Sequence, residues 1–372
     1  MKWLIAPDSF KNCLRSPQVA AQLAAGIRDI SPDDEIIELP LADGGEGTAE
    51  AAARAAGGTL ESVPVTGPLG NPVEARFAWL PAGTVVVEMA EAAGLERLPD
   101  GKNDPLRATT YGVGELIAHA VDSGCRKILL GLGGSATNDG GCGCAAALGV
   151  RFYDADGQSF VPVGDTLGRI ARIDTAEADE LLRSVEITVM CDVTNPLYGP
   201  TGAAYVFAPQ KGADAEKVKS LDAGLHHFGD VIRSQYGLDV SAMPGAGAAG
   251  GMGAGCVALL GGTIQSGIDA VLDVTGFDRQ LEGADLVITG EGRIDSQSAD
   301  GKVISGVARR TKAKGVPLIA IAGGIADSAG AVYDIGVSAM FSTDRAALPV
   351  DMLGARSPGD YEATLNDVMS LI

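Results

Sequence analysis

Apolar residues along this chain fall into two patterns: short continuous runs, and longer stretches with helical spacing. At the start, an apolar run at 3–6 predicts a strand, and the apolar periodicity of 17–30 predicts a helix. Ser16 followed by Pro17 is a suitable N-cap and first helical residue. Patterns of the same two kinds predict further strands at 35–39, 127–131, 187–191, 286–289, 318–322 and 339–342, and further helices at 49–56, 112–123, 140–148, 303–313 and the end of the chain.

The middle of the chain differs from its two ends. Between 59 and 90, β-branched runs with prolines and glycines predict hairpins and a mixed sheet. Because strand–helix–strand units lie at both ends, we predict an α/β fold in which 1–75 and 276–372 form one flavodoxin- or Rossmann-like parallel domain. Residues 76–275 would form an inserted mixed-sheet α/β domain, with the active site in the cleft. The glycine- and alanine-rich segment 245–262 is either a hinge or a tightly packed helix start.

Composition and charge narrow the function classes. With 372 residues, of which 46% are hydrophobic, the chain can fill more than one core. A formal charge of −20 repels nucleic-acid phosphates and anionic lipids, which argues against a nucleic acid or a membrane as a partner. No apolar stretch is long enough to span a bilayer, and the six scattered cysteines are expected to be reduced thiols. These features predict a cytoplasmic protein and leave a homo-oligomer open.

A glycine-rich loop at 131–141, Gly-Leu-Gly-Gly-Ser-Ala-Thr-Asn-Asp-Gly-Gly, follows one predicted strand. Its glycines allow close approach of the backbone, and its N–H groups with the next helix start can hold an anion such as phosphate. An ordinary tight turn, with Thr137, Asn138 or Asp139 capping the helix, is the alternative. The residues that we predict to bind nucleotide phosphates are Gly133, Gly134, Ser135, Thr137 and Asn138.

The same loop raises a second function class. Gly131, Gly133 and Ala136 match the G-x-G-x-x-A pattern of dinucleotide-binding proteins, which would make the chain an NAD(P)-dependent dehydrogenase of a small hydroxy acid. Against this, the acidic residue expected after the next strand is only loosely matched, and the loop is rich in hydroxyl and amide groups. A G-x-G-x-x-G sequence at 245–250 follows no convincing strand. The dehydrogenase stays open as an alternative.

Acidic residues follow several predicted strands, where ligands gather in open α/β sheets. Phosphoryl transfer uses carboxylates to place Mg²⁺ and to accept a hydroxyl proton. Each acidic residue alone can instead cap a helix or hold a turn. The candidates are Asp43, Glu46, Asp192, Glu291 and Asp295.

Basic residues give fewer candidates. Lys11, after the first predicted strand, can neutralise a phosphate or a substrate carboxylate, and Lys211 and Lys302 are weaker candidates. The sequence contains neither G-x-x-x-x-G-K-[ST] nor the protein-kinase motifs, which excludes the two common phosphate-transfer scaffolds. The three histidines fall in predicted helices and are expected to be structural.

Five motifs stand out together. They are Ala-Pro-Asp-Ser-Phe-Lys at 6–11, Pro-Leu-Ala-Asp-Gly-Gly-Glu-Gly-Thr at 40–48, the loop at 131–141, Cys-Asp-Val-Thr-Asn-Pro at 191–196, and Thr-Gly-Glu-Gly-Arg-Ile-Asp-Ser at 289–296. In these motifs the chain resembles the bacterial glycerate kinases of type 1, from end to end. The resemblance implies two α/β domains, one of them flavodoxin-like, and phosphorylation of D-glycerate by ATP with Mg²⁺. It favours 2-phosphoglycerate as the product, with 3-phosphoglycerate as the alternative.

Within that reaction, we assign roles on physical grounds. Asp192 and Asp295 are expected to place Mg²⁺. Asp192, with Asp43 as the second choice, is expected to accept the proton of the attacking hydroxyl. A non-catalytic binder of small anions is the third class that stays open. The residues expected to position glycerate are Ser9, Lys11, Asp43, Glu46 and Glu291, of which Lys11 also counts as catalytic.

Overall fold

The computed structural model describes residues 1–10, 14–98, 102–299, 301–346 and 357–370, which form two compact units. The terminal unit contains Met1–Asp43, Glu50–Gly58 and Ser266–Ile372. The inserted unit contains Gly44–Ala49 and Thr59–Gln265. Residues 59–75 therefore lie in the inserted unit and 266–275 in the terminal unit, which differs from the boundaries expected from sequence.

The terminal unit is built on a parallel sheet to which both ends of the chain contribute, as predicted. The strand order is β14-β13-β12-β1-β2, and every neighbouring pair is parallel. Side chains alternate across this sheet, so that Trp3 and Ile5 enter one core while the buried Leu4 faces the other side. The strands are β1 (Lys2–Ile5), β2 (Glu35–Glu38), β12 (Leu286–Ile294), β13 (Leu318–Ile325) and β14 (Ala339–Ser342).

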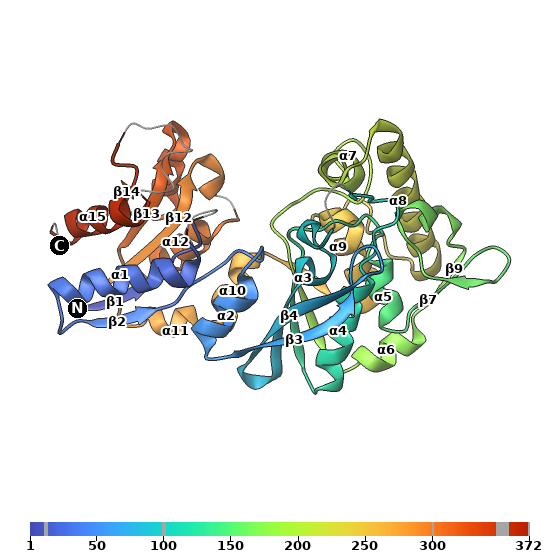
Figure 1. Ribbon diagram of the computed structural model, residues 1–372, viewed down its shortest axis with the longest axis horizontal. Coiled ribbons are helices and arrows are strands. Elements are labelled where there is room, and N and C mark those ends of the chain that lie inside the picture. The colour runs from blue at the N-terminus through green and yellow to red at the C-terminus, as the bar shows by residue number, and fades with distance from the viewer. Residues whose placement is uncertain (11–13, 99–101, 300, 347–356, 371–372) are drawn as a thin grey trace. The chain divides into compact units, whose positions relative to one another are not determined.

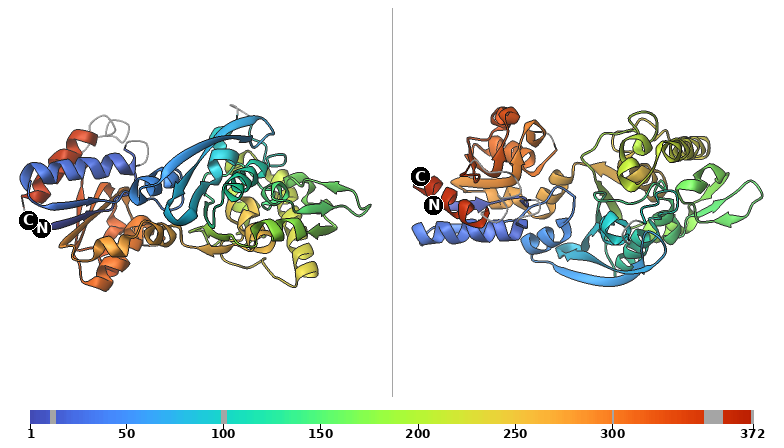
Figure 2. Two further views of the ribbon diagram at one scale, coloured as in Figure 1. Left: turned by 90° about the horizontal axis from the view of Figure 1, so that it is seen from below. Right: turned by 45° about the horizontal axis from the view of Figure 1, so that its top comes forward.

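Helices α1 (Ser16–Ile30) and α15 (Ser357–Met369) pack side by side on one face of this sheet (Figures 1 and 2). Gly26 allows their close approach, because a Cβ there would lie 2.4 Å from Leu365 Cδ2. The predicted N-cap of α1 is wrong by one residue. The helix already includes Ser16, and the N–H of Arg15 donates to Gln18 Oε1 at 2.9 Å.

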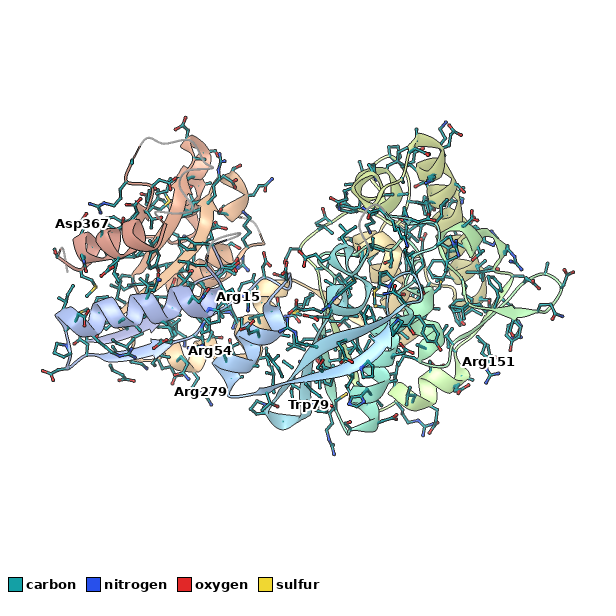
Figure 3. The ribbon with its side chains drawn as sticks, in the orientation of Figure 1. Arg15, Arg54, Trp79, Arg151, Arg279 and Asp367 are labelled. Atoms are coloured by element: carbon teal, nitrogen blue, oxygen red, sulfur yellow. The ribbon has the colours of Figure 1, made fainter. Side chains whose placement is uncertain are left out.

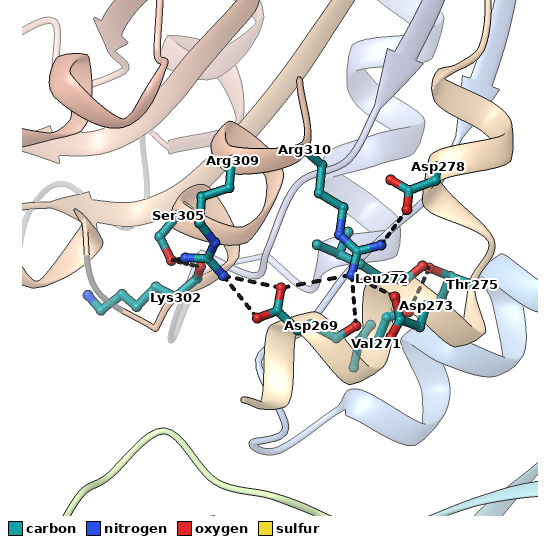
Figure 4. A network of polar contacts seen from close by, with 10 residues as sticks. All are labelled: Asp269, Val271, Leu272, Asp273, Thr275, Asp278, Lys302, Ser305, Arg309 and Arg310. Atoms are coloured by element: carbon teal, nitrogen blue, oxygen red, sulfur yellow. Dashed lines mark hydrogen bonds and ion pairs between the residues drawn. The ribbon is translucent and has the colours of Figure 1, made fainter. Parts of the chain in front are cut away.

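A polar network joins three further helices of the terminal unit, α10 (Gly267–Val274), α11 (Phe277–Leu281) and α12 (Val303–Lys314) (Figure 4). The guanidinium of Arg310 donates to Asp273 at 2.6 Å and to Asp278 at 2.7 Å. Arg309 bonds both carboxylate oxygens of Asp269 at 3.1 and 3.2 Å. Among the described residues, the other α-helices of this unit are α2 (Thr48–Ala56), whose first two residues belong to the inserted unit, and α13 (Ala331–Ile335).

The inserted unit has a mixed sheet, as the β-branched and proline-containing segment predicted. Its strand order is β11-β10-β6-β5-β4-β3, with antiparallel β3–β4 and β4–β5 pairs and parallel pairing across the rest. The strands are β3 (Thr59–Thr66), β4 (Pro72–Leu80), β5 (Thr84–Glu88), β6 (Lys127–Gly131), β10 (Glu186–Met190) and β11 (Thr263–Gln265), and a separate small sheet contains β7 (Arg151–Tyr153), β8 (Ser159–Phe160) and β9 (Arg172–Asp174).

One hydrophobic core serves the inserted unit. Strand β5 is buried along its whole length, and its Val85 and Val87 share this core with Leu116 and Ile117. The helices are α3 (Met89–Ala93), α4 (Tyr111–Asp122), α5 (Cys142–Ala147), α6 (Ala176–Leu182), α7 (Ala203–Phe207), α8 (Ala215–Tyr236) and α9 (Ala248–Leu260). Within the described ranges, no helix combines the length and apolar character needed to cross a bilayer.

Candidate active site

The loop at 131–141, here called the glycine loop, connects the end of β6 to α5. Its two halves differ in exposure. Gly133 and Gly134 are exposed, whereas Ser135 is buried and Thr137 and Asn138 have no exposed surface. The structure therefore brings the five predicted phosphate-binding residues into one loop, but only the two glycines face solvent. The Oγ1 of Thr137 and both polar atoms of the Asn138 side chain have no hydrogen-bond partner among the described residues.

Lys211 holds this loop from inside the protein. Its Nζ donates to Ser135 Oγ at 2.7 Å and to the Thr137 carbonyl at 2.6 Å. The side chains of Arg15 and Arg151, labelled in Figure 3, extend from the ribbon and are 73% and 62% exposed. Lys211, by contrast, is only 1% exposed. Burial lowers the pKa of Lys211 to about 7, and the negative charge of Asp139 partly opposes that shift.

Asp139 holds the other half of the glycine loop. Its carboxylate accepts hydrogen bonds from the N–H of Thr110 at 2.8 Å, the hydroxyl of Thr110 at 2.9 Å, and the N–H groups of Gly141 and Gly143 at 3.1 and 3.2 Å. Full burial raises the pKa of Asp139, while these four hydrogen bonds act in the opposite direction. Asp139 thus satisfies N–H groups at the start of α5, which is the helix-capping role that the alternative interpretation gave to this segment.

Glycines of α9 pack directly against the glycine loop. Gly250 has φ +68°, and a Cβ there would lie 2.2 Å from the Thr137 carbonyl oxygen. A Cβ at Gly255 would lie 2.1 Å from the carbonyl oxygen of Gly140, whose N–H donates to the Gly250 carbonyl at 3.0 Å. The segment 245–262 is therefore a tightly packed helix start. The G-x-G-x-x-G sequence within it has no strand directly before it and serves packing.

A second glycine-containing loop, residues 44–49, lies against the first. A Cβ at Gly131 would lie 2.5 Å from the Gly44 carbonyl oxygen, and one at Gly133 would lie 3.1 Å from Gly45 Cα. Glu46 is exposed in this loop. The two loops can approach this closely only because the positions that face each other lack side chains.

Glu88 anchors this second loop, and sequence reasoning missed it. It ends β5 beside Gly131 of β6, and its carboxylate accepts from the N–H groups of Gly47 at 2.9 Å and Ala49 at 2.7 Å. Burial raises the pKa of Glu88 to about 7, although both hydrogen bonds favour the ionised form. The signal in the sequence was an acidic residue directly after the β-branched run Thr-Val-Val-Val.

Asp192 lies at the same edge of the inserted unit's sheet. Strand β10 ends at Met190, which pairs with Gly131, so the residues that follow both strands leave the sheet at one edge. Asp192 is exposed there, whereas the carboxylates of Glu88 and Asp139 are buried. A ligand that arrives from solvent can therefore reach Asp192 but not the carboxylates of Glu88 and Asp139.

The terminal unit gathers its own polar residues at the carboxyl edge of its sheet. Ser9 follows β1 and Asp43 follows β2, while Glu291 lies on β12, the other neighbour of β1. Strand β12 is longer than predicted, so that Glu291 pairs with Ala322 inside the sheet and does not lie in a loop. The structure thus places three of the expected substrate-binding residues at one sheet edge. Lys11, expected there too, lies outside the described residues.

Glu291 is buried but incompletely paired. Lys302 Nζ lies 3.5 Å from Glu291 Oε2, and Oε1 has no hydrogen-bond partner among the described residues. Burial raises the pKa of Glu291, opposed by Ser298 and Lys302. Beyond the strand, Asp295 Oδ1 accepts from the N–H of Gln297 at 2.9 Å, so one of its carboxylate oxygens holds a turn.

Asp8 is a further polar residue of this edge that the sequence did not single out for a role. It is 8% exposed, its Oδ1 accepts from the N–H of Ser9, and its own N–H donates to the Gly290 carbonyl, at 2.6 and 2.8 Å. Asp8 therefore fixes the loop that carries Ser9. The three histidines each contact a neighbouring polar group: His119 bonds Glu61 and His227 bonds the Ile170 carbonyl, each at 2.7 Å, and His226 Nδ1 lies 3.3 Å from Asp230 Oδ2.

Comparison with known proteins assigns a chemistry to this geometry. Residues 3–372 match the glycerate kinase family. The chain belongs to this family. It is 44% identical over 373 residues to a glycerate kinase of Bacillus subtilis (strain 168), covering 100% of this chain and 98% of the relative. It is 46% identical over 343 residues to a glycerate 2-kinase of Escherichia coli (strain K12), covering 92% and 90%.

A solved structure agrees with this family membership. A crystal structure from Salmonella typhimurium LT2, described as a candidate glycerate kinase 2, superposes with a TM-score of 0.90 at 43% identity, covering 100% of this chain and 98% of that one. As a member of the glycerate kinase family, the chain is a phosphotransferase with an alcohol group as acceptor, and kinase membership implies ATP as the donor. The dehydrogenase and the non-catalytic binder are thereby set aside.

Proposed function

We propose that this enzyme transfers the γ-phosphoryl group of ATP to the 2-hydroxyl of D-glycerate and releases 2-phosphoglycerate. The choice of the 2-hydroxyl is supported by the relative named glycerate 2-kinase, 46% identical over 92% of this chain. One observation carries the phosphoryl-transfer chemistry. The exposed backbone at Gly133 and Gly134 lies on a loop whose interior is fixed by two buried, oppositely charged groups, Lys211 and Asp139.

The glycine loop is proposed to bind the ATP phosphates through backbone N–H groups. Such groups bind phosphate well when they are already oriented, because no energy is then spent in ordering them during the reaction. The hydrogen bonds of Lys211 to Ser135 and Thr137 supply that order within three residues of the exposed glycines. In the buried interior, the ammonium charge also acts through a lower dielectric than it would in water.

The donor set fits a magnesium ion that is bound mainly by nucleotide phosphates. The described residues contain no cluster of three or more acidic, histidine or cysteine side chains that could hold a metal ion. Mg²⁺ in kinases commonly uses only one or two carboxylates together with phosphate oxygens, and the exposed Asp192 suits that role. Asp295 is the second candidate, with Oδ2 left after Oδ1 has bonded the turn. When bound, Mg²⁺ neutralises charge that develops on the phosphates.

The acceptor is proposed to bind through Ser9, Asp43, Glu46 and Glu291, with Lys11 adding a positive charge. Asp192 is the first choice for the base that accepts the hydroxyl proton, and Asp43 is the second. No covalent enzyme intermediate is needed. Most of the rate enhancement would come from positioning and charge neutralisation.

A coupled ADP-release assay with truncated acceptors tests this function. We expect Mg²⁺-dependent turnover with D-glycerate and its loss on chelation by EDTA. D-Lactate keeps the 2-hydroxyl and lacks the 3-hydroxyl, whereas 3-hydroxypropionate has the reverse. The proposal predicts weak turnover with D-lactate and none with 3-hydroxypropionate. The opposite preference would move the transfer to the 3-hydroxyl, and no turnover with any of the three acids would contradict the proposal.

A further inference from the structure

Lys211 is buried at a position where an apolar side chain would need less free energy to be buried. It ends the short 3₁₀ turn Pro209–Lys211, and its side chain reaches a loop more than seventy residues earlier in the sequence. Burying an ammonium group costs several kcal/mol unless its N–H groups are satisfied, and a methionine of similar length would avoid that cost. Two of its three N–H donors form bonds, at 2.7 Å and 2.6 Å, and both bonds go to the glycine loop.

Lys211 cannot reach a ligand in solvent directly, since only 1% of its surface is exposed. Its two partners, however, lie within three residues of the exposed Gly134. The bond to Ser135 fixes a side chain, and the bond to Thr137 fixes a peptide plane of the same loop. Any effect of Lys211 on a phosphate must therefore pass through these two residues or through its electric field.

We propose that Lys211 is a positioning residue, which holds the glycine loop in its phosphate-binding conformation through Ser135 and Thr137 and places a positive charge behind the bound ATP phosphates. Asp139 is the matching restraint on the other half of the loop, through Thr110, Gly141 and Gly143. The inference rests on the proposed function, because it assumes that this loop binds ATP.

The protonation of Lys211 gives the proposal a pH dependence. Burial lowers the pKa of Lys211 to about 7, and Asp139 is the charged group that acts on it. A lysine is charged below its pKa, so the positive charge behind the loop is lost as the pH rises through about 7. The affinity for ATP should fall over the same range. Asp139 itself stays hydrogen-bonded to the loop and adds no positive charge.

The first test replaces the charge and keeps the volume. We expect Lys211→Met to raise KM for ATP about 10- to 100-fold, as lost charge-assisted hydrogen bonds do, and to leave KM for D-glycerate unchanged. The alkaline fall of kcat/KM for ATP near pH 7 should disappear in this variant. Lys219→Met is the control, because Lys219 is a 63% exposed lysine paired with Glu216 on α8. An unchanged KM for ATP with an unchanged pH profile would overturn the proposal.

A double-mutant cycle with Ser135→Ala tests the route of the effect, and the Ser135→Ala variant by itself remains informative if Lys211→Met folds poorly. Ser135→Ala alone should also raise KM for ATP, and adding it to Lys211→Met should make little further difference. Fully additive effects would contradict a route through Ser135. Calorimetric titration with ATP tests this proposal without any turnover. Tighter ATP binding by the wild type than by Lys211→Met supports the positioning role even if glycerate is not the acceptor. Equal binding rejects that role.

Discussion

The two candidate regions of this enzyme are built in opposite ways. In the inserted unit, the charged groups around the glycine loop are buried and hydrogen-bonded: Lys211 makes two bonds, Asp139 four and Glu88 two. In the terminal unit, Glu291 Oε1 has no hydrogen-bond partner within the described ranges, and Lys302 Nζ lies 3.5 Å from Oε2 on a side chain that is 31% exposed. Ser9 and Asp43 are half-buried.

This difference indicates a division of labour. A loop that is fixed before the ligand arrives suits ATP phosphates, whose charge must be met by groups already in place. A looser set of polar groups suits a small hydroxy acid, because the ligand itself can supply the missing hydrogen-bond partners. Changes to the buried groups that hold the glycine loop should therefore alter loop geometry and stability, and changes to the polar groups of the terminal unit should mainly alter acceptor binding.

The largest effect should come from the proposed base. We expect Asp192→Asn to lower kcat about 100- to 10,000-fold, the usual contribution of general base catalysis, with little change in KM for ATP. Asp43→Asn should lower kcat by a smaller factor if Asp192 is the base. Steady-state kinetics of both variants, with the exposed Asp156→Asn as a control, would decide between the two units. A larger loss of kcat in Asp43→Asn would transfer the role of base to the terminal unit.

The next effect tests the packing of the glycine loop. Gly250→Ala should destabilise the protein by more than about 3 kcal/mol, because its Cβ would clash with the backbone of Thr137 2.2 Å away. Gly237 has the same φ of +68°, but a Cβ there would have no neighbour within 4 Å. Gly237→Ala should therefore lower the free energy of unfolding by only about 1 kcal/mol. Denaturant unfolding measures the free energy of unfolding of both variants. Equal losses would mean that backbone conformation, and not contact with the loop, decides the effect.

A third effect concerns the anchor of the second loop. The pKa of Glu88 is raised from 4.5 to about 7, so the folded state holds this proton more tightly than the unfolded state. The resulting stabilisation is present below pH 4.5 and is lost as the pH rises to about 7, with an upper bound of about 3 kcal/mol. The unfolding free energy of Glu88→Gln should lack this decrease. Parallel pH dependences in the two proteins would show that Glu88 does not titrate in this range.

The smallest effect should be in the terminal unit. Glu291→Gln removes a charge at the sheet edge and should raise KM for D-glycerate about tenfold, close to the value of one hydrogen bond to a charged group. KM for ATP should not change. The exposed Glu282→Gln on the same unit serves as the control. If KM for ATP rose instead, the division of labour between the two units would be wrong.

Local patterns in the sequence were enough to predict much of the fold. Apolar runs marked all five strands of the parallel sheet and strands β6 and β10 of the mixed sheet, but not β5 or β11. Asp43, Asp192 and Asp295 do follow strand ends, whereas Glu291 lies inside β12. The glycine loop was also visible, since its composition permits close backbone approach. One local prediction that failed was the N-cap of α1, which is Arg15 and not Ser16, with the Arg15 N–H bonded to Gln18 Oε1.

Tertiary contacts determined the rest, and no local pattern reports them. In Ala-Pro-Gln-Lys-Gly the sequence marks Lys211 only as a weaker candidate for neutralising a negative charge, and only the fold shows that it is buried against Ser135. Gly250 and Thr137 meet across more than one hundred residues of sequence. Strand β12 extends to Ile294 because β13 offers partners as far as Ile325, which moves Glu291 from a loop into the sheet.

Phosphorus NMR of the reaction product, recorded with proton coupling, tests the central claim most directly. In 2-phosphoglycerate the phosphorus is coupled through the ester oxygen to a single proton on C2, and in 3-phosphoglycerate to the two protons on C3. Incubation of the enzyme with ATP, Mg²⁺ and D-glycerate should therefore yield a new ester signal that is split into a doublet. A triplet would contradict transfer to the 2-hydroxyl, and no new ester signal would contradict the proposed reaction itself.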